Sequence, residues 1–589
     1  MGSNNALLSV YSEIKDVNNR LSVIEKERSE LKEKLHVLTA KANELEARWN
    51  NDDEHSTWND NSFPWDSKVD GSLKKVFGLT SFRPLQRAAI NLALSGEDSL
   101  IIMSTGAGKS LCYQLPAVVN EGSFNLDGIT LVISPLISLV NDQLMHLQTL
   151  HINAMAFNAA TSKEDASNIL KSICERKSAL RMLYVTPEKL AKSKRFMNKL
   201  EKCYEMGLLK LIAIDEVHCC SQWGHDFRPD YKFLGILKRQ FPKTPLMGLT
   251  ATATLDVITD VKKILDVRGC VTLKTAFNRK NLYYQVIQKP DSNDATNKLI
   301  SALLKGDFKH QSGIIYCLSR KDCEELTQDL KKEGVNCAFY HGDLESGARV
   351  RVHERWNSGQ YQVIIATLAF GMGIDKANVR FVIHHSIAKS MENYYQESGR
   401  AGRDDNPSKC IVLFRMADVF RQSTMNYTDS VSHLYGMMKY CIQNYECRRV
   451  AMSEYFGETY EKNWCEKGCD FCERDNVNVE EIDITTQARL VMEILQDKQL
   501  GKDRITGNKL LELLYKKLED SRDFLEKIVG TLLLEGYLKE EFHFTPYSVI
   551  SYIVWGSRSV QGRVTILSDL NSMVGKSSAK RRKNNNSNK

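Results

Sequence analysis

Short apolar runs alternate with longer amphipathic stretches from residue 64 to residue 413. Each run is a few residues long, which suits a strand buried on both faces, and the stretches between runs are long enough for helices. This alternation is typical of parallel sheets covered by helices. The segment has room for two such domains, which we assign to residues 64–276 and 277–413. The runs are Ser99–Ser104, Ile129–Ser134, Leu209–Asp215, Ser312–Cys317 and Gln362–Thr367.

Residues 1–49 carry a seven-residue repeat instead. Its apolar seam is interrupted only by Arg28, and a repeat sustained over about four and a half heptads predicts a coiled coil. We therefore expect residues 14–45 to pair with a second copy or with another helix. The alternative is a solvated helix that packs on the chain's own body. Residues 50–63 are acidic and rich in Asn, which indicates a linker.

The pattern changes again after residue 413. Residues 414–476 are helical and then rich in cysteine, and residues 477–570 hold helical stretches followed by a short hairpin at 536–545. The tail at 571–589 is polar and predicted to be disordered. Its basic run, 580–583, would suit a nuclear import signal, or alternatively would only contact DNA phosphates.

The composition is that of a multidomain globular chain inside the cell. Of its 589 residues, 42% are hydrophobic and 26% are charged, and the net charge of +7 is too small to indicate nucleic acid unless it is clustered. There is no apolar run of about 18 residues that could span a membrane, and the polar N-terminus lacks the apolar core of a signal peptide. We expect no membrane partner, and cysteines that are reduced rather than paired in disulfides.

A glycine-rich turn follows the apolar run around Ile101. Its sequence, Met103–Ser110, precedes a helical stretch, so its backbone N–H groups would face phosphates at a helix N-terminus. Lys109 would contact the β and γ phosphates of ATP, and the Ser110 hydroxyl would bind Mg²⁺. Met103 stands where the strict consensus has glycine, so the turn alone does not settle the assignment.

Two further segments supply the rest of a nucleotide site. Asp215 and Glu216 end an apolar run, and the carboxyl end of a strand is where α/β sheets bind ligands. Asp215 would hold Mg²⁺ through its hydration shell, while Glu216 would orient and deprotonate the attacking water. Arg400 and Arg403, three residues apart among glycines, could reach the γ-phosphate from a second domain.

Four cysteines have the spacing of a zinc site. Cys447, Cys465, Cys469 and Cys472 follow the pattern C-x17-C-x3-C-x2-C. Four thiolates from a helix and a tight turn suit tetrahedral Zn²⁺, and a reducing compartment disfavours disulfides.

The order of these segments resembles the RecQ family of DNA helicases, most closely its short eukaryotic RecQL type. The resemblance runs from about residue 64 to about residue 565, and the stretch His218–Tyr231 is its most specific part. It implies an α/β fold with two RecA-like lobes, a zinc-binding module at 414–476 and a winged-helix domain at 477–570. The matching stretches are Phe82–Gln86, Thr105–Gln114, Ser134–Leu139, Val185–Glu188, Asp215–Tyr231, Leu249–Thr254, Tyr340–Gly342, Ala366–Asp375 and Gln396–Asp404.

The resemblance also implies roles for particular residues. Some relatives stack an aromatic ring on the adenine base where this chain has Leu79. Relatives also carry an aromatic side chain at the tip of the hairpin, where we place Phe542. The alternative is that Phe542 packs inward. By this resemblance, the adenine would contact Arg83 and Gln86, and the phosphates would contact Thr105, Gly106 and Gly108. Catalysis would also involve His218 and Gln396, and DNA would contact Trp223, Phe227 and Arg228.

We therefore expect an ATP-driven enzyme that moves 3′ to 5′ along single-stranded DNA and unwinds forked or branched duplexes in the nucleus. ATP, Mg²⁺ and Zn²⁺ are the expected cofactors. Two alternatives are an RNA helicase of the same superfamily and a DNA-binding or strand-annealing scaffold without productive hydrolysis. The intact Lys109, Asp215, Glu216 and Arg403 argue against the scaffold.

Overall fold

The computed structural model describes residues 57–569, apart from 120–127, 136, 222–227, 252, 276, 372–375, 426, 428–430, 459, 476 and 501–502, together with three isolated positions near the N-terminus. Residues 1–61 form one compact unit and residues 62–589 another. Arg20, Glu27 and Lys34 are helical and exposed. The rest of the coiled-coil segment 14–45 and the tail at 571–589 lie outside the described residues, so both remain predictions.

The first lobe is built on a parallel sheet in which the described strands run in the order β3-β4-β2-β5-β6-β1-β7. Every pair of neighbours is parallel, and Leu100 lies opposite Gly248 where β1 meets β6. Because almost every residue in β1, β2, β4, β5 and β6 is buried, these strands read as continuous apolar runs rather than as alternating patterns. The strands are β1 Ser99–Ile102, β2 Ile129–Ile133, β3 Ala154–Phe157, β4 Met182–Val185, β5 Leu209–Ile214, β6 Leu246–Thr250 and β7 Val271–Lys274.

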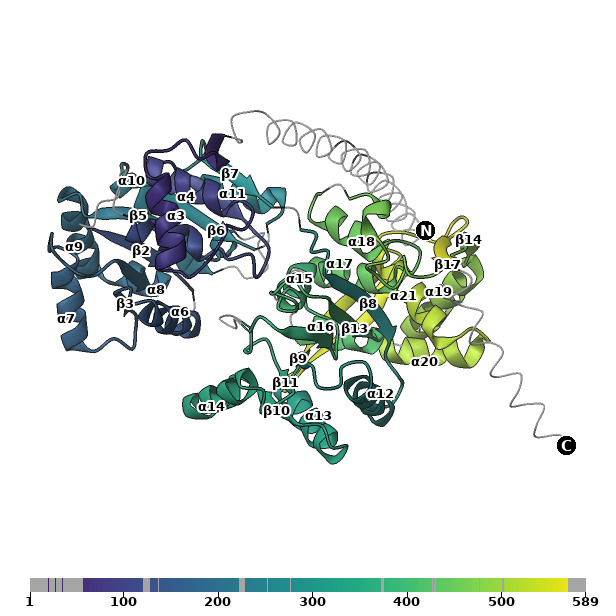
Figure 1. Cartoon of the computed structure of the whole chain (residues 1–589). Helices are drawn as coiled ribbons and strands as arrows, with labels where there is room; N and C mark the ends of the chain where they lie inside the picture. The colour runs from purple at the N-terminus through teal and green to yellow at the C-terminus, as the bar shows by residue number, and fades with distance from the viewer. Residues whose placement is uncertain are drawn as a thin grey trace. The chain divides into compact units, whose positions relative to one another are not determined.

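Helices pack against this sheet, with α4 against β1, α6 and α7 against β3, and α9 against β5 (Figure 1). Several begin at a Ser or Thr whose hydroxyl accepts from a backbone N–H, as Thr254 does at the start of α11. The longer helices are α3 Asp66–Lys75, α4 Gln86–Ser95, α6 Ile137–Thr149, α7 Lys163–Ser172, α9 Lys194–Glu205 and α11 Leu255–Ile264. The shorter ones are α5 Leu111–Gln114, α8 Pro187–Lys192 and α10 Gly235–Gln240.

The second lobe has its own parallel sheet, with described strands in the order β10-β11-β9-β12-β13-β8. A core that includes Phe308 and Phe381, whose rings stack 4.3 Å apart, lies between this sheet and its helices. Its strands are β8 Leu282–Gln288, β9 Ser312–Tyr316, β10 Cys337–Tyr340, β11 Val363–Ala366, β12 Val379–His384 and β13 Ser408–Phe414. Its helices are α12 Asn293–Lys305, α13 Arg320–Lys332, α14 Ser346–Asn357 and α15 Met391–Ser398. The prediction of two parallel-sheet lobes is confirmed.

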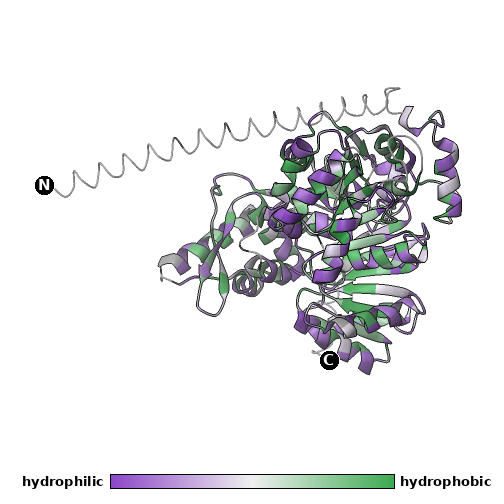
Figure 2. Cartoon of the chain, turned by 90° about the vertical axis from the view of Figure 1, so that its left-hand side faces the viewer, coloured by the Kyte–Doolittle hydropathy of each residue, from purple (hydrophilic) through white to green (hydrophobic). Residues whose placement is uncertain are grey.

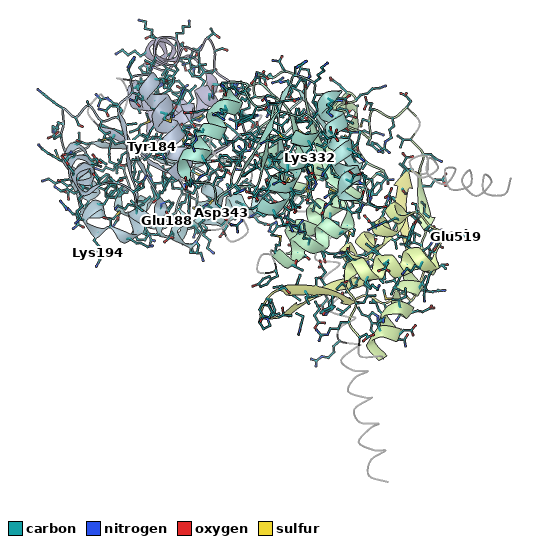
Figure 3. The ribbon with its side chains drawn as sticks, turned by 90° about the horizontal axis from the view of Figure 1, so that it is seen from below. Tyr184, Glu188, Lys194, Lys332, Asp343 and Glu519 are labelled. Atoms are coloured by element: carbon teal, nitrogen blue, oxygen red, sulfur yellow. The ribbon has the colours of Figure 1, made fainter. Side chains whose placement is uncertain are left out.

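Several strands are coloured as hydrophobic in Figure 2, and hydrophilic residues make up much of the helices around them. Lys194 and Glu519 are exposed and extend from the surface, whereas Tyr184 is buried in the first lobe (Figure 3). Within the described residues, every helix is too short or too polar to cross a membrane.

The last part of the chain is mainly helical and contains two small antiparallel pairs, β14 with β17 and β15 with β16. Helix α17 packs against α15 of the second lobe, and α21 packs against α17 and α20. The helices are α16 Met416–Met425, α17 Val431–Ile442, α18 Arg448–Tyr455, α19 Thr485–Leu500, α20 Gly507–Lys517 and α21 Arg522–Leu534. The strands are β14 Val479–Asp483, β15 Leu538–Phe544, β16 Val549–Trp555 and β17 Thr565–Asp569.

The predicted hairpin at 536–545 was too short. That segment supplies only β15, and its partner β16 follows after a turn at 545–548, so the hairpin extends to residue 555. The second strand carries the β-branched and aromatic residues that favour strands, and Pro546 stands in the turn between them.

Candidate functional site

The glycine-rich turn leaves the end of β1 and enters the short helix α5. Gly106 and Gly108 have φ values of +82° and +81°, a region that glycine adopts without strain. A Cβ on Gly108 would lie 2.5 Å from Nε2 of Gln86, so a larger residue there would displace that side chain. The turn thus presents its backbone to a cavity of ≈ 440 Å³.

Lys109 lies inside this turn and is held in place by it. Its Nζ donates to the carbonyl oxygen of Met103 at 3.1 Å. Burial lowers the pKa of Lys109, and the nearby carboxylates of Glu216 and Asp215 oppose that shift. The ammonium group thus lies within the electrostatic influence of two carboxylates that line the same cavity.

Asp215 and Glu216 follow the last residue of β5, as the sequence predicted. The backbone N–H of Asp215 donates to the Ile133 carbonyl oxygen at 2.8 Å, which ties the turn to β2. Glu216 has a φ of +48°, a left-handed conformation uncommon for a residue with a side chain. Burial and the neighbouring Glu216 raise the pKa of Asp215 to about 7, and Lys109 acts in the opposite direction. Glu216 is buried and Asp215 is half-buried, and two carboxylates this close together fit a site for a divalent cation.

His218 links this turn to the next strand. Its Nδ1 lies 2.9 Å from Oγ1 of Thr250, at the end of β6, and 3.3 Å from Oε2 of Glu216. The buried ring thus connects the Glu216 carboxylate to the end of β6.

Arg83 and Gln86 lie directly against the glycine-rich turn. Gln86 accepts from the backbone N–H of Arg83 at 2.8 Å and donates to the Gly108 carbonyl oxygen at 3.0 Å. The Arg83 guanidinium donates to the carbonyl oxygens of Gly106 and Arg403. Both side chains line the cavity, as does the half-exposed Leu79. Phe77, which sequence reasoning missed, also lines it and supplies an aromatic ring near Leu79.

The second lobe contributes Gln396, Arg400 and Arg403 from α15 and the loop after it. All three line the same cavity as Lys109 and Glu216, together with Thr105 and Ser110. A Cβ on Gly106 would lie 3.0 Å from Cγ of Arg403, which shows how closely this arginine approaches the turn. The predicted phosphate, water-activating and arginine groups thus meet in one place.

A second cavity, of ≈ 170 Å³, adjoins the first. Glu216, Gln396 and Arg400 line both cavities, and His218 and Arg228 line the second. Arg228 Nη1 donates to the Pro135 carbonyl oxygen at 3.0 Å. Trp223 and Phe227, the predicted DNA-contacting aromatics, fall in 222–227, outside the described residues.

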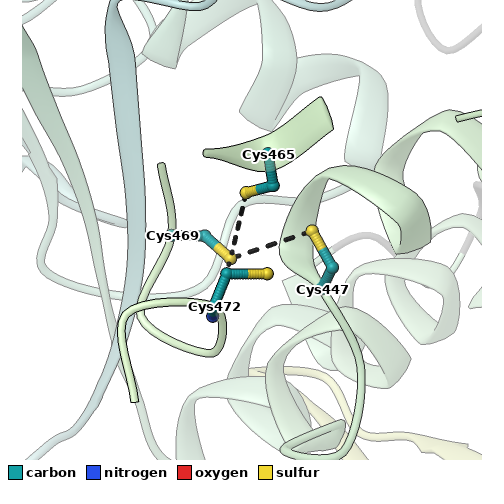
Figure 4. A group of neighbouring side chains, drawn as sticks. All are labelled: Cys447, Cys465, Cys469 and Cys472. Atoms are coloured by element: carbon teal, nitrogen blue, oxygen red, sulfur yellow. Dashed lines mark hydrogen bonds between the residues drawn. The ribbon is translucent and has the colours of Figure 1, made fainter. Parts of the chain in front are cut away.

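The four predicted cysteines come together in one group (Figure 4). Their sulfur atoms all lie within 4.8 Å of one another, and Cys469 Sγ lies 3.9 Å from that of Cys447 and 3.7 Å from that of Cys465. Sulfurs bound to one tetrahedral Zn²⁺ are about 3.8 Å apart, given Zn–S bonds of about 2.3 Å. Cys447, Cys465 and Cys469 are buried and Cys472 is half-buried.

The thiols also favour a metal electrostatically. Hydrogen bonds from Cys447 and Cys465 hold the pKa of Cys469 far below its ordinary value, while burial raises the pKa of Cys472 to about 12. Hydrogen bonds from the neighbouring thiols and from backbone N–H groups thus stabilise one thiolate, and Zn²⁺ would replace the thiol protons. The donor set and its spacing fit zinc.

The hairpin β15–β16 places its aromatic residues differently from the prediction. Phe542 pairs with Ser551 in the middle of the ladder and is half-buried, so it is not at the tip. The tip is the turn at 545–548, where Tyr547 is 97% exposed, and Phe544 at the end of β15 is 60% exposed. The placement of Phe542 was wrong because the strand continues two residues further than the sequence pattern indicated. Pro546, next to Tyr547, was the missed signal of the turn.

Comparison with known proteins agrees with this geometry. Three family models match in sequence: the DEAD/DEAH box helicase at 83–261, the helicase conserved C-terminal domain at 295–405 and the RecQ zinc-binding domain at 413–473. The chain is 53% identical over 529 residues to the putative ATP-dependent DNA helicase Q1 of Caenorhabditis elegans, covering 87% of this chain and 83% of the relative. It is 46% identical over 573 residues to ATP-dependent DNA helicase Q1 of Mus musculus, covering 94% and 87%.

Proposed function

The chain belongs to the RecQ family of ATP-dependent DNA helicases, and from this premise we propose that it hydrolyses ATP to move 3′ to 5′ along single-stranded DNA and to unwind forked or branched duplexes. One observation carries the proposal. Lys109 and Glu216 of the first lobe and Arg403 of the second line a single cavity. Such a cavity changes shape when the lobes move, which is how hydrolysis drives motion along a strand.

Each side chain in the cavity has a proposed role in hydrolysis. Lys109 binds the β and γ phosphates, and Arg400 and Arg403 stabilise the charge that develops on the γ-phosphate. Glu216 orients the attacking water and accepts its proton. Ser110 and Asp215 would hold Mg²⁺, which supplies further charge neutralisation on the phosphates when bound.

We assign the coupling to DNA to the second cavity. His218 contacts Glu216 and lines this cavity together with Arg228, which follows the aromatic-rich segment 222–227. Trp223 and Phe227 would stack on unpaired bases, an interaction that does not depend on base identity. Binding of a strand would then be felt through Arg228 and His218 at the water-activating carboxylate.

The C-terminal part separates the strands. We propose that 414–476 is the zinc-binding module and that 477–570 is a winged-helix domain carrying the hairpin. Tyr547, nearly fully exposed at the hairpin tip, is the better candidate for the ring that replaces stacking at the opened base pair. Phe542, half-buried within β15, would support the strand instead.

The ends of the chain determine location and assembly in this proposal. The basic run at 580–583 would direct the protein to the nucleus, and residues 14–45 would join it to a second copy or another helical partner. A fusion lacking 576–589 that still enters the nucleus normally would contradict the first assignment.

The test is an unwinding assay on partial duplexes that carry a single-stranded tail at either the 3′ or the 5′ end. The expected result is ATP-dependent strand separation of the 3′-tailed DNA, with the 5′-tailed DNA and the matching RNA duplex left intact. Lys109→Ala is the inactive control. Unwinding of RNA alone, or strand annealing without ATP-dependent unwinding, would favour the RNA helicase or the scaffold.

A further inference from the structure

A short connecting segment, residues 277–281, joins the two sheets between β7 and β8. One of its side chains, Arg279, reaches into the loop that carries the two cavity arginines. Its guanidinium donates to the carbonyl oxygen of Gly399 at 2.8 Å and to that of Gly402. These are the residues immediately before Arg400 and Arg403, so Arg279 holds the peptide units from which both cavity arginines extend.

A second side chain of the same segment supports this contact. Asn281 Nδ2 donates to the Gly402 carbonyl oxygen at 2.8 Å and to that of Asn406 at 3.0 Å. Gly402 has a φ of +56°, and a Cβ there would lie 2.4 Å from the Asn281 amide nitrogen. The loop therefore fits tightly on the connecting segment, held by side-chain hydrogen bonds from Arg279 and Asn281 to the carbonyl oxygens of both glycines.

The connecting segment is in turn held by the zinc-binding module. Arg449, in the first turn of α18 and two residues after Cys447, donates to the carbonyl oxygens of Arg279 at 3.0 Å and Lys280 at 3.4 Å, and also to that of Leu282. It is 4% exposed. Its guanidinium passes so close to Gly468, in the turn between Cys465 and Cys469, that a Cβ there would lie 2.8 Å from its Nη2.

A ring stack and two hydrogen bonds hold the same segment at Phe277. The ring of Phe277 stacks on that of Phe456, just after α18, at 4.4 Å, and the Tyr395 hydroxyl of α15 donates to the Phe277 carbonyl oxygen at 2.9 Å. The backbone N–H of Phe277 donates to Glu458 at 3.0 Å. A continuous set of contacts thus runs from the cysteine group to the peptide units of the cavity arginines.

We propose that Arg279 is a positioning residue for ATP hydrolysis, and that the zinc-binding module holds it in place through Arg449. Through these contacts the module affects hydrolysis by fixing the loop of Arg400 and Arg403, in addition to stabilising the fold. The inference rests on the proposed roles of those two arginines. Arg279 itself contacts backbone oxygens, including that of Thr105 in the phosphate-binding turn at 3.5 Å, so its removal leaves the side chains of Lys109, Asp215 and Glu216 in place.

The first experiment measures DNA-stimulated ATP hydrolysis by Arg279→Ala and Arg279→Lys in the full chain. A loop shifted by about 1 Å can cost on the order of 100-fold in rate, so kcat of Arg279→Ala should fall about 10- to 100-fold. The KM for ATP should stay within about twofold, because uniform nucleotide binding is untouched. Arg279→Lys should recover part of the rate, since an ammonium cannot hold two carbonyls in the fork geometry of a guanidinium. The matched control is Arg558→Ala, an exposed arginine that also donates to a backbone carbonyl oxygen.

The second experiment separates positioning from folding of the module. Arg449→Lys should keep its zinc, measured by elemental analysis, and its melting temperature, yet lose kcat. The double variant with Arg279→Ala should be no slower than Arg279→Ala alone, because both act on one contact path. Wild-type kcat in Arg279→Ala would overturn the proposal. It would also fail if Arg449→Lys lost both zinc and rate while Arg279→Lys kept wild-type kcat. Arg403→Ala tests the underlying proposed function separately. Full activity in that variant would refute the proposed role of Arg403 in stabilising charge on the γ-phosphate.

Discussion

The Tyr435 hydroxyl of α17 donates a hydrogen bond to the Glu540 carboxylate of β15 at 3.0 Å. The hydroxyl of Ser423 in α16 donates to the same carboxylate at 2.6 Å, and that of Ser551 in β16 donates as well. Burial raises the pKa of Glu540, and the three hydroxyls counteract that shift. The exposed hairpin is therefore anchored, through one buried acid, to two helices that follow the second lobe.

Loosening this anchor should impair strand separation without affecting hydrolysis. Glu540→Ala removes one acceptor from three hydroxyls, of which that of Ser423 can still donate to the Phe420 carbonyl oxygen. Each buried hydroxyl left unsatisfied costs about 1–3 kcal/mol. We expect unwinding to fall several-fold while single-stranded-DNA-stimulated ATPase stays within about twofold of wild type. Glu541→Ala, at an exposed position on the same strand, is the control. Equal unwinding by the two variants would show that the anchor does not matter.

The hairpin tip should depend on Tyr547 more than on Phe542. Base–aromatic stacking is worth about 1–3 kcal/mol per base, comparable with the stacking lost at each opened step. Tyr547→Ala should cut duplex unwinding sharply and leave DNA-stimulated ATPase nearly intact, and Tyr547→Phe should be tolerated. Phe542→Ala should show the smaller unwinding defect. The reverse order in a strand-displacement assay would restore Phe542 as the wedge.

Zinc should be needed for the fold of the cysteine-rich module. Cys469→Ser removes the sulfur that lies closest to two of its neighbours, so we expect loss of metal and a lower melting temperature. Elemental analysis and thermal unfolding check both. Cys441→Ser, a buried cysteine outside the group, controls for the loss of any thiol. Folded wild-type protein without zinc would contradict the assignment.

Lys527 should make stability depend on pH. Its ammonium is buried between Asn444 and Ser568, and burial lowers its pKa to about 7, below the ordinary value of about 10.4 expected in the unfolded chain. Between these values the unfolded state binds more protons, so raising the pH stabilises the folded state. The melting temperature of wild type minus that of Lys527→Met should therefore rise from pH 7 to pH 10. A difference that stays constant or falls would mean that Lys527 remains charged throughout.

Much of this arrangement could be predicted from sequence because its chemistry is local. The continuous apolar runs identified strands such as β1 and β5, and Lys109 and Asp215 follow directly from where those strands end. The spacing of the four cysteines was sufficient to predict that they form a metal-binding group. Phe542 was misplaced because strand length depends on pairing with β16, which a one-strand pattern does not reveal. Arg279 and Glu540 left no signal, since Arg279 contacts backbone oxygens at least 120 residues away and two of the three hydroxyls on Glu540 lie more than 100 residues away.

We propose that DNA binding and ATP hydrolysis are coupled through the cavity that residues of both lobes line. The most direct test is the rate of ATP hydrolysis by the purified full chain with and without single-stranded DNA, in parallel with Glu216→Gln. DNA should strongly stimulate hydrolysis by the wild type. Glu216→Gln should still bind nucleotide but hydrolyse it at least about 100-fold more slowly. Hydrolysis that is indifferent to DNA, or a Glu216→Gln variant as fast as wild type, would contradict this coupling.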